Sequence, residues 1–206
     1  MISRQELILR LSSPLHENET DFAFLNKSSP KTKPASVLIP ILDASGGSNS
    51  PDWHLLYTRR TDRVADHKGQ VSFPGGRADL HDPNPEATAL REAYEEIGLA
   101  PQDVQIIGKL ARLPTITNYM VTPVIGLIPW PYTFILQPEE VSRVFTIPIT
   151  WLSETSNHET HYRETIPGEP PDSFHEIVYF KPYRDEILWG ATAVITLRLL
   201  IKLSTP

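Results

Sequence analysis

The segment REAYEEIGL, residues 91–99, combines one arginine with three glutamates at short spacing. Glu92 and Glu95 are three residues apart, and Glu92 and Glu96 are four apart, so a helix would carry all three carboxylates on one face. Like charges at these spacings repel each other and destabilise the helix. Divalent cations such as Mg²⁺ and Mn²⁺ bind oxygen ligands and would relieve the repulsion. The spacing is therefore typical either of a metal site or of a solvated acidic helix face.

A helix over residues 85–97 would position these carboxylates. Asn84 suits the N-cap, Pro85 suits the first helical position, and Gly98 suits the position just past the helix end. Upstream, the segment FPGG at 73–76 supplies two glycines, where a backbone can turn tightly or approach a ligand closely. The order of strand, glycine turn, loop and carboxylate helix favours the metal site over the solvated face.

The segment GGRADLHDPNPEATALREAYEEIGL, residues 75–99, resembles the signature box of the Nudix hydrolases, G-x5-E-x7-R-E-U-x-E-E-x-G-U, in which U is apolar. The run REAYEEIG matches every defining position in its half of the box. Asp82 stands where glutamate is usual, and eight residues instead of seven separate it from Arg91. Since this first acidic position mainly supports the loop, metal binding remains the expectation.

Further segments resemble one branch of that family, the coenzyme A pyrophosphatases. The run LLYTRRTDRVADHKGQVSFPGG, residues 55–76, is similar to the branch pattern LLTxRSxxLRxHxGQxxFPGG. The segments EEVSRVFTIPITWL and ILWGATAVI are similar to two later branch patterns, so the resemblance covers about residues 37–203. Several members of the branch also carry the aspartate and the longer spacing. One position departs: Ala65 stands where the branch has arginine, although Arg63 is two residues away.

The resemblance implies hydrolysis of a nucleoside diphosphate linked to another group, with water attacking phosphorus. Glu92, Glu95 and Glu96 would hold Mg²⁺ or Mn²⁺, with the carbonyl of Gly76 or of its neighbouring glycine as a further ligand. Such ions neutralise phosphate oxygens and lower the pKa of the attacking water. Arg91 would orient a glutamate instead of contacting the substrate.

Two glutamates are candidates for the general base. Glu140 belongs to a segment that the branch resemblance places near the metal site, and Glu139 is adjacent to it. A competing interpretation makes both of them surface residues at a helix start after Pro138. Glu95 is the alternative base, because a glutamate of the box has this role in some Nudix enzymes.

A basic cluster precedes the glycine turn in an otherwise acidic chain. It consists of Arg59, Arg60, Arg63, His67 and Lys68. These side chains would suit the phosphates of coenzyme A, since the cluster leads directly into the metal-site turn. The alternative is a set of exposed charges at the end of a strand.

The whole chain has the length and composition of one globular domain. Its 206 residues are 40% hydrophobic and 21% charged, and 20 prolines divide it into short elements. We expect a single domain over residues 1–206, with an N-terminal helix and loop over 1–35, a core over 36–203 and the box over 75–99.

Hydrophobic runs bounded by turn residues predict strands at 36–42, 53–60, 104–113, 121–128 and 175–180. Besides the carboxylate helix, helices are predicted near the N-terminus, around Leu7 and Leu11, and over 190–203, with Ile201 on its apolar face. The polar segment 153–173 is predicted to be a long insertion loop. The fold class is therefore α/β (α+β), and the resemblance implies a Nudix-type α/β/α sandwich with a mixed sheet and the box as loop, helix and loop.

Composition excludes several classes of function. The net charge of −6 and the pI near 5.6 argue against a protein that coats nucleic acid. The absence of cysteine excludes a disulfide scaffold, a thiolate zinc site and a cysteine nucleophile, and it makes a reducing cytoplasm the default. No run approaches the roughly 20 apolar residues that cross a bilayer. We expect a cytoplasmic protein that binds a small nucleotide and neither nucleic acid nor membrane; the sequence leaves a homodimer open.

Three functions compete. The first is a Mg²⁺- or Mn²⁺-dependent coenzyme A diphosphatase that releases 3′,5′-ADP and 4′-phosphopantetheine. The second is a Nudix hydrolase for ADP-ribose, dinucleotides or nucleoside triphosphates. The third is a noncatalytic ligand sensor with the Nudix fold, and the presence of all three box glutamates argues against it.

Overall fold

A mixed β-sheet forms the centre of the molecule. The computed structural model describes residues 2–13, 32–61, 69–163 and 175–205. The strands of the sheet are β1 (Lys33–Asp43), β2 (Trp53–Arg60), β3 (Val71–Ser72), β4 (Gly75–Arg77), β5 (Gln105–Lys109), β6 (Leu113–Pro114), β7 (Tyr119–Leu127) and β8 (Val141–Pro148). Their main order is β3-β2-β1-β7-β5, with β8 against β2, β4 against β1 and β6 against β7. β1 and β7 run parallel and the other pairs antiparallel, so the sheet is mixed, as predicted.

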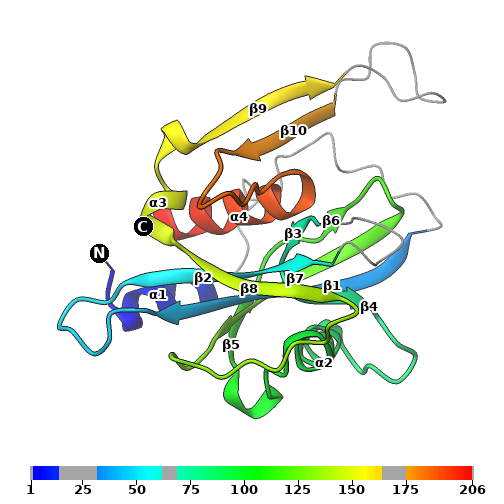
Figure 1. Cartoon of the computed structure of the whole chain (residues 1–206), viewed down its shortest axis with the longest axis horizontal. Coiled ribbons are helices and arrows are strands. Elements are labelled where there is room, and N and C mark those ends of the chain that lie inside the picture. The colour runs from blue at the N-terminus through cyan, green and yellow to red at the C-terminus, as the bar shows by residue number, and fades with distance from the viewer. Residues whose placement is uncertain (1, 14–31, 62–68, 164–174, 206) are drawn as a thin grey trace.

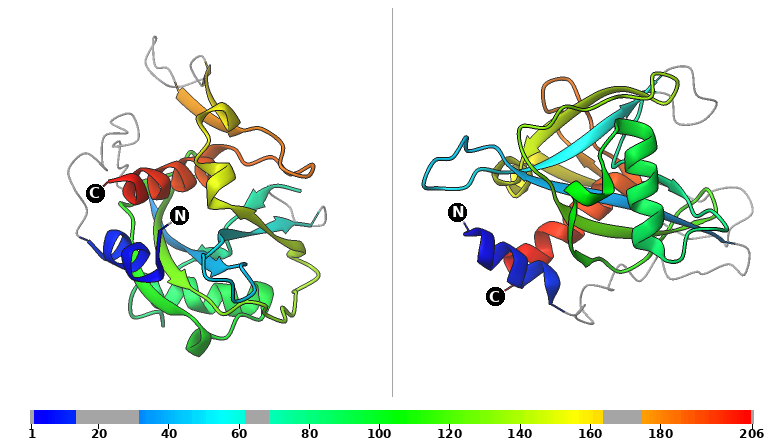
Figure 2. Two further views of the ribbon diagram at one scale, coloured as in Figure 1. Left: turned by 90° about the vertical axis from the view of Figure 1, so that its left-hand side faces the viewer. Right: turned by 90° about the horizontal axis from the view of Figure 1, so that it is seen from below.

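Helices cover both faces of this sheet. They are α1 (Arg4–Ser12), α2 (Pro85–Ile97), α3 (Ile149–Leu152) and α4 (Gly190–Ser204), with short 3₁₀ turns η3 (Pro101–Asp103) and η4 (Thr155–Asn157). α2 lies on one face, and α1 and α4 lie on the other (Figures 1 and 2). The predicted α/β/α sandwich is therefore confirmed. In the described part of the chain, no helix combines the length and apolarity needed to cross a bilayer.

The alternation of side chains along the strands divides the core in two. On β2, Leu56 packs with the buried face of α2, whereas Leu55 and Tyr57 pack on the side of α1 and α4. The Tyr57 hydroxyl is 3.0 Å from the hydroxyl of Thr196 on α4, so its buried polar group is satisfied. Burying one large apolar side chain contributes about 1.5 to 3 kcal/mol to the stability of the fold, and this determines which side chains of the strand face each layer. Residues that follow one another on β2 must therefore leave opposite faces.

The C-terminal helix forms where it was predicted, and Ala193, Leu197 and Leu200 of its predicted apolar face pack in the core, but Ile201 does not. Ile201 is 47% exposed, whereas Arg198 and Lys202 are buried. Arg198 Nη1 donates to the Ala111 carbonyl at 3.2 Å, and Lys202 Nζ donates to the Ser13 carbonyl at 3.0 Å. Placing Ile201 on the buried face was therefore wrong, because backbone carbonyls satisfy two cations that periodicity assigns to the surface.

The segment 153–173 contains more regular structure than predicted. Its first part forms η4 and β9 (His158–Arg163), which pairs antiparallel with β10 (His175–Phe180) in a separate two-stranded sheet. Val178 and Phe180 of β10 belong to the core on the α4 side. The sequence did not indicate β9 because its residues are mostly polar. Its partner β10 supplies the apolar side chains that pack in the core. Residues 164–173 lie outside the described part of the chain.

Candidate active site

Helix α2 has the predicted ends. Asn84 Oδ1 accepts a hydrogen bond from the Ala87 N–H at 2.8 Å, and Gly98 ends the helix with φ 67°. Three fully buried residues of the helix pack against the sheet: Ala89, Ala93 and Ile97. Because this apolar stripe faces the sheet, the glutamates leave the helix in other directions.

The three glutamates of α2 differ sharply in exposure. The side chain of Glu95 is 56% exposed, that of Glu92 is 16% exposed, and that of Glu96 is 4% exposed. Glu96 lies beneath the glycine turn, where its Oε2 accepts a hydrogen bond from the Gly75 N–H at 3.2 Å. A Cβ added to Gly76 would lie 2.5 Å from Glu92 Oε2, so any other residue here would displace the Glu92 carboxylate.

Burial and crowding of charge disfavour ionisation at this site. Burial raises the pKa of Glu96 to about 8, although the Arg60 guanidinium and the Gly75 N–H act in the opposite direction. Arg60 Nη1 lies 3.7 Å from Glu96 Oε1. Burial also raises the pKa of Glu92, and the nearby charge of Glu140 contributes to the rise at both glutamates. A divalent cation would favour the charged forms of all these carboxylates.

Arg91 joins the loop before α2 to two of the glutamates. Its Nη1 is 2.9 Å from Glu92 Oε1 and 2.9 Å from Glu95 Oε2. Its Nε and Nη2 donate to the two oxygens of Asp82 at 3.2 and 3.0 Å, and Nη2 also donates to the Arg77 carbonyl at 3.0 Å. The hydrogen bonds from Arg91 are the main cause that lowers the pKa of Asp82 to about 2. This geometry lets Arg91 orient the glutamates while Asp82 supports the loop.

The donor set fits a hard divalent cation. No three acidic or histidine side chains of the described residues already converge as metal ligands do, since Arg91 holds Glu92 and Glu95 while Glu96 faces Gly75 and Arg60. The available donors are nevertheless carboxylate and carbonyl oxygens, the type that Mg²⁺ and Mn²⁺ prefer. Because Gly76 has no side chain, its backbone lies close to the Glu92 carboxylate. These residues therefore suit such an ion chemically.

Glu140 lies in a turn at residues 138–140, directly before β8. The competing interpretation was therefore wrong about a helix start after Pro138, although both glutamates are surface residues as it expected. The turn is fixed to the active-site elements, because the Gln137 N–H donates to the Glu96 carbonyl at 2.9 Å and the Thr61 N–H donates to the Glu140 carbonyl at 3.0 Å. Glu140 is exposed, and its charge acts on Glu92 and Glu96. Glu139 is also exposed, and its carbonyl accepts a hydrogen bond from the Thr61 hydroxyl at 3.0 Å.

The structure divides the predicted basic cluster. Arg60 faces the α2 side and pairs with Glu96, whereas Arg59 pairs with Glu186, Nη1 to Oε2 3.2 Å, on the α4 side. The alternation of β2 separates the two side chains, and a bulge in its pairing with β8 falls between them. The other members of the predicted cluster, Arg63, His67 and Lys68, lie outside the described residues, as does Ala65.

Two charged residues near Arg59 were not singled out from the sequence. Arg143 on β8 stands opposite Arg59 in register, and both guanidiniums contact the buried carboxylate of Glu186. The alternation of Arg143 with Phe145 places the arginine on the Phe145 side of β8. Nothing in the sequence signals a partner for Glu186, because 43 residues separate it from Arg143.

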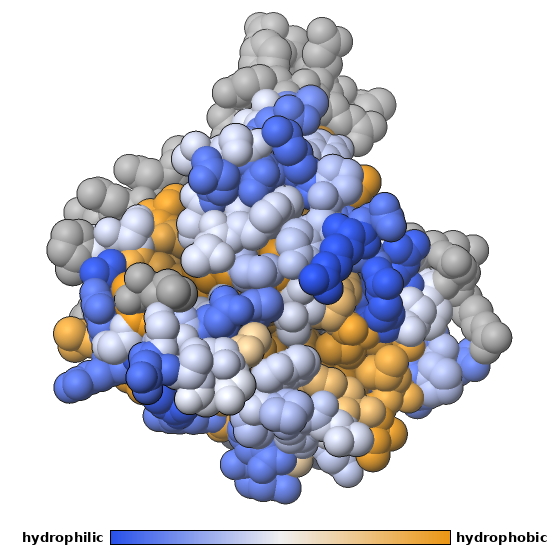
Figure 3. Space-filling view, turned by 60° about the vertical axis from the view of Figure 1, so that its left-hand side comes forward, coloured by the Kyte–Doolittle hydropathy of each residue, from blue (hydrophilic) through white to orange (hydrophobic). Residues whose placement is uncertain are grey.

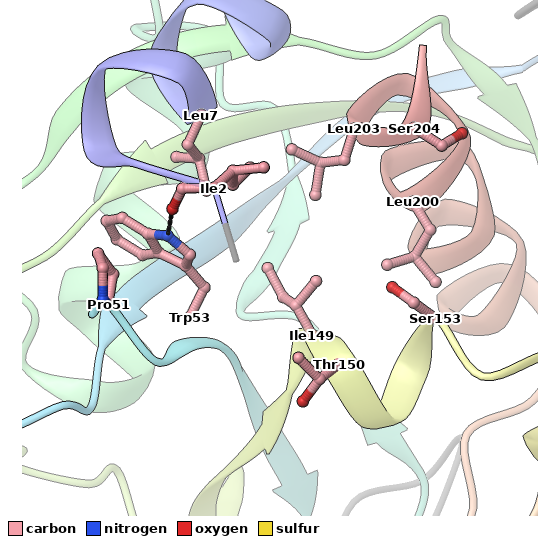
Figure 4. A pocket seen from close by; sticks show the side chains of 10 residues that line it. All are labelled: Ile2, Leu7, Pro51, Trp53, Ile149, Thr150, Ser153, Leu200, Leu203 and Ser204. Carbon is pink, nitrogen blue, oxygen red and sulfur yellow. Dashed lines mark hydrogen bonds between the residues drawn. The ribbon is translucent and has the colours of Figure 1, made fainter. Parts of the chain in front are cut away.

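A cavity of about 380 Å³ lies elsewhere, among α1, α3, the C-terminal end of α4 and the start of β2 (Figure 4). Its lining is mainly apolar, and Trp53 Nε1 donates to the Ile2 carbonyl at 2.9 Å beside it. The space-filling view shows apolar residues in patches between hydrophilic ones (Figure 3). The cavity is lined by Ile2, Leu7, Pro51, Trp53, Ile149, Thr150, Ser153, Leu200, Leu203 and Ser204. This lining contains no charged side chain, so the cavity does not suit a pyrophosphate.

Known proteins resemble this chain. A family model described as NUDIX domain matches residues 32–181. Relatives named "Uncharacterized Nudix hydrolase NudL" from Yersinia pestis (strain Pestoides F) and Yersinia pseudotuberculosis serotype O:1b (strain IP 31758) are each 35% identical over 201 residues, covering 97% of this chain and 94% of theirs. A crystal structure of a MutT/nudix family protein from Enterococcus faecalis matches with a TM-score of 0.48 and 15% identity, covering 99% of this chain and 73% of that one. On the family model and these relatives, the chain belongs to the Nudix hydrolase family.

Proposed function

We propose that this chain hydrolyses coenzyme A or its derivatives at the pyrophosphate, giving 3′,5′-ADP and 4′-phosphopantetheine, and that it acts in the cytoplasm. The observation that carries the hydrolytic part is the burial of Glu96 beneath the Gly75–Gly76 turn, with Glu92 and Glu95 on the same helix. The choice of coenzyme A rests on the resemblance of residues 55–76, and of two later segments, to that branch.

Each polar residue of the site has a proposed task. Glu92, Glu95, Glu96 and the Gly76 carbonyl would hold Mg²⁺ or Mn²⁺, which when bound neutralises phosphate oxygens and lowers the pKa of water. Arg91 keeps Glu92 and Glu95 in place through its ion pairs.

Glu140 is the proposed general base. Its carboxylate would take the proton of the attacking water as the new P–O bond forms and the bridging P–O bond breaks. Its exposure leaves the carboxylate accessible to water, and its backbone is tied to Thr61 at the end of β2. Glu95, 56% exposed, is the alternative base.

A panel of pyrophosphate substrates tests the proposed function. Coenzyme A, dephospho-coenzyme A, ADP-ribose, NADH and a nucleoside triphosphate would be compared by kcat/KM, with products identified. Contacts of a charged side chain to the 3′-phosphate contribute about 1.5 to 3 kcal/mol, so coenzyme A should exceed dephospho-coenzyme A by roughly ten- to hundredfold. Faster cleavage of ADP-ribose, or equal rates on the two coenzymes, would contradict coenzyme A as the substrate. It would favour a hydrolase for ADP-ribose, dinucleotides or nucleoside triphosphates.

Variants of the basic cluster test whether its side chains recognise the 3′-phosphate of coenzyme A. Arg63→Ala or Lys68→Ala should reduce the preference for coenzyme A over dephospho-coenzyme A without slowing both substrates equally. Ala65→Arg restores the arginine of the branch pattern and should increase that preference. If all three variants leave the ratio unchanged, the cluster does not recognise this phosphate.

A further inference from the structure

Two arginines from neighbouring strands converge on one buried carboxylate. Arg59 on β2 and Arg143 on β8 are opposite in register, and both contact Glu186 in the segment between β10 and α4. The carboxylate is 2% exposed, whereas the arginine side chains are 40% and 52% exposed. One negative and two positive charges leave a net charge of +1 at this place. It differs from the α2 site in residues and in the face of the sheet.

Glu186 is held in position by a tight turn. The Tyr183 N–H donates to the Glu186 carbonyl at 2.8 Å, and the Glu186 N–H donates to the Tyr183 carbonyl at 3.0 Å. Between them, Arg184 and Asp185 have φ of 48° and 69°, a region that is unfavourable for residues other than glycine. Such a turn persists only where surrounding contacts enforce it, and the two ion pairs of Glu186 are contacts of this kind.

In the part of the chain that the structure describes, several hydrogen-bond donors of the two arginines have no acceptor. Glu186 contacts only Nη1 of Arg59 and Nη2 of Arg143, whereas each guanidinium carries five N–H groups. Within the described residues, no acceptor engages the remaining N–H groups of either arginine. The Arg143 guanidinium also lies over the Phe145 ring at 5.5 Å, which restricts its orientation. Two partly exposed guanidiniums thus share one carboxylate, and residues 2–13, 32–61, 69–163 and 175–205 leave some of their N–H groups without an acceptor.

We propose that Arg59 and Arg143, fixed by Glu186 as their internal counter-ion, form a second anion site that binds a phosphate monoester. A carboxylate can be satisfied by one guanidinium fork, whereas the three terminal oxygens of a phosphate monoester can accept from two. The local net positive charge also attracts an anion. The phosphate can be free in solution or, resting on the proposed function, a phosphate of the substrate outside its pyrophosphate.

Calorimetric titration with inorganic phosphate, in EDTA to exclude divalent ions, tests the site directly. Wild-type protein should bind phosphate saturably in the millimolar range, and Arg143→Gln should weaken this binding about tenfold. Arg143→Lys should also weaken it, because it keeps the charge but loses the fork. Arg112→Gln removes an exposed arginine between β5 and β6 and is the charge-matched control. Equal binding by Arg143→Gln and Arg112→Gln, or no saturable binding by the wild type, overturns the proposal.

Steady-state kinetics separates the two sources of phosphate. If the substrate supplies it, Arg143→Gln raises KM for coenzyme A about tenfold but leaves kcat, and KM for dephospho-coenzyme A, unchanged. If free phosphate is the ligand, both KM values stay unchanged while calorimetry still shows weakened phosphate binding. Either result supports the anion site. A failure of the proposed function appears differently, as absent pyrophosphate hydrolysis alongside intact phosphate binding.

Discussion

At the scale of single residues, the neighbours Glu95 and Glu96 occupy contrasting environments. Glu96 is enclosed by the glycine turn and faces Arg60, whereas Glu95 is exposed and held by Arg91. The two carboxylates can therefore serve one metal site while contributing differently to the folded structure.

Replacing either carboxylate by its amide should abolish most activity. Glu95→Gln and Glu96→Gln should each lower kcat by about a hundredfold or more, because each removes a charge that would act on the metal and phosphate. Glutamine at position 96 can still accept the Gly75 N–H, so the fold should be retained. Circular dichroism and steady-state kinetics would measure the two effects. Near-normal kcat in a folded variant contradicts the metal-ligand assignment.

The proposed base differs from its neighbour Glu139. Glu140→Gln should lower kcat by about a hundredfold or more with a smaller rise in KM, because a base acts in the transition state. Glu139→Gln, an exposed neighbour in the same turn, is the control and should have a much smaller effect on kcat. A change in KM alone would make Glu140 a substrate-binding residue and leave Glu95 as the base.

At the scale of elements, one ion pair connects the loop of the box to α2. Asp82 receives two hydrogen bonds from Arg91 and one from the Asp79 N–H, the last at 2.8 Å. The loop therefore brings Asp82 to Arg91 although it is one residue longer than the usual box and carries aspartate in place of glutamate.

Removing this pair should destabilise the loop and helix together. Asp82→Asn should lower the free energy of unfolding at pH 7 by about 1.5 to 3 kcal/mol, the range for hydrogen bonds to charged groups. Asp79→Asn alters an exposed carboxylate of the same loop and is the control. Urea unfolding would measure both variants, and equal losses would mean that the Arg91 pair is not the cause.

The same pair predicts a dependence of stability on pH. The folded-state pKa of Asp82, about 2, lies below the ordinary value of 3.8, so its contribution is present above pH 3.8 and is lost as the pH falls toward 2. The difference in unfolding free energy between wild type and Asp82→Asn should therefore shrink between about pH 4 and pH 2. Unfolding measured across this range tests it; a constant difference would contradict the lowered pKa.

At the scale of the whole molecule, the proposed chemistry needs segments that are distant in the sequence. The glycine turn, α2 and the turn before β8 meet through backbone hydrogen bonds to the Glu96 carbonyl and side chain. A bound cation would favour the charged forms of the acidic groups gathered in this way.

Removing divalent ions should therefore abolish hydrolysis by the intact protein. Activity should disappear in EDTA and return with Mg²⁺ or Mn²⁺ but poorly with Ca²⁺, whose larger radius and looser coordination suit phosphoryl transfer less well. Rates would be measured after dialysis against each ion. Full activity in EDTA, or with Ca²⁺ alone, would contradict the assigned metal chemistry.

The sequence by itself determined the elements whose signals are local. Helix α2 begins and ends at the predicted residues because Asn84, Pro85 and Gly98 act on their own backbone neighbourhood. β2 likewise follows from its own hydrophobic run, residues 53–60. The three- and four-residue spacing of the glutamates also predicted a candidate site on this helix, and metal binding there stays a prediction.

Only the tertiary structure decided how these parts are used. It buried Glu96 and left Glu95 exposed, it sent Arg59 and Arg60 to opposite faces, and it brought Glu186 to Arg59 and Arg143. It also paired the polar strand β9 with β10. Burial, ion pairing and strand partnership depend on contacts between residues far apart in the chain, and local spacing carries no information about which distant segment will be the partner.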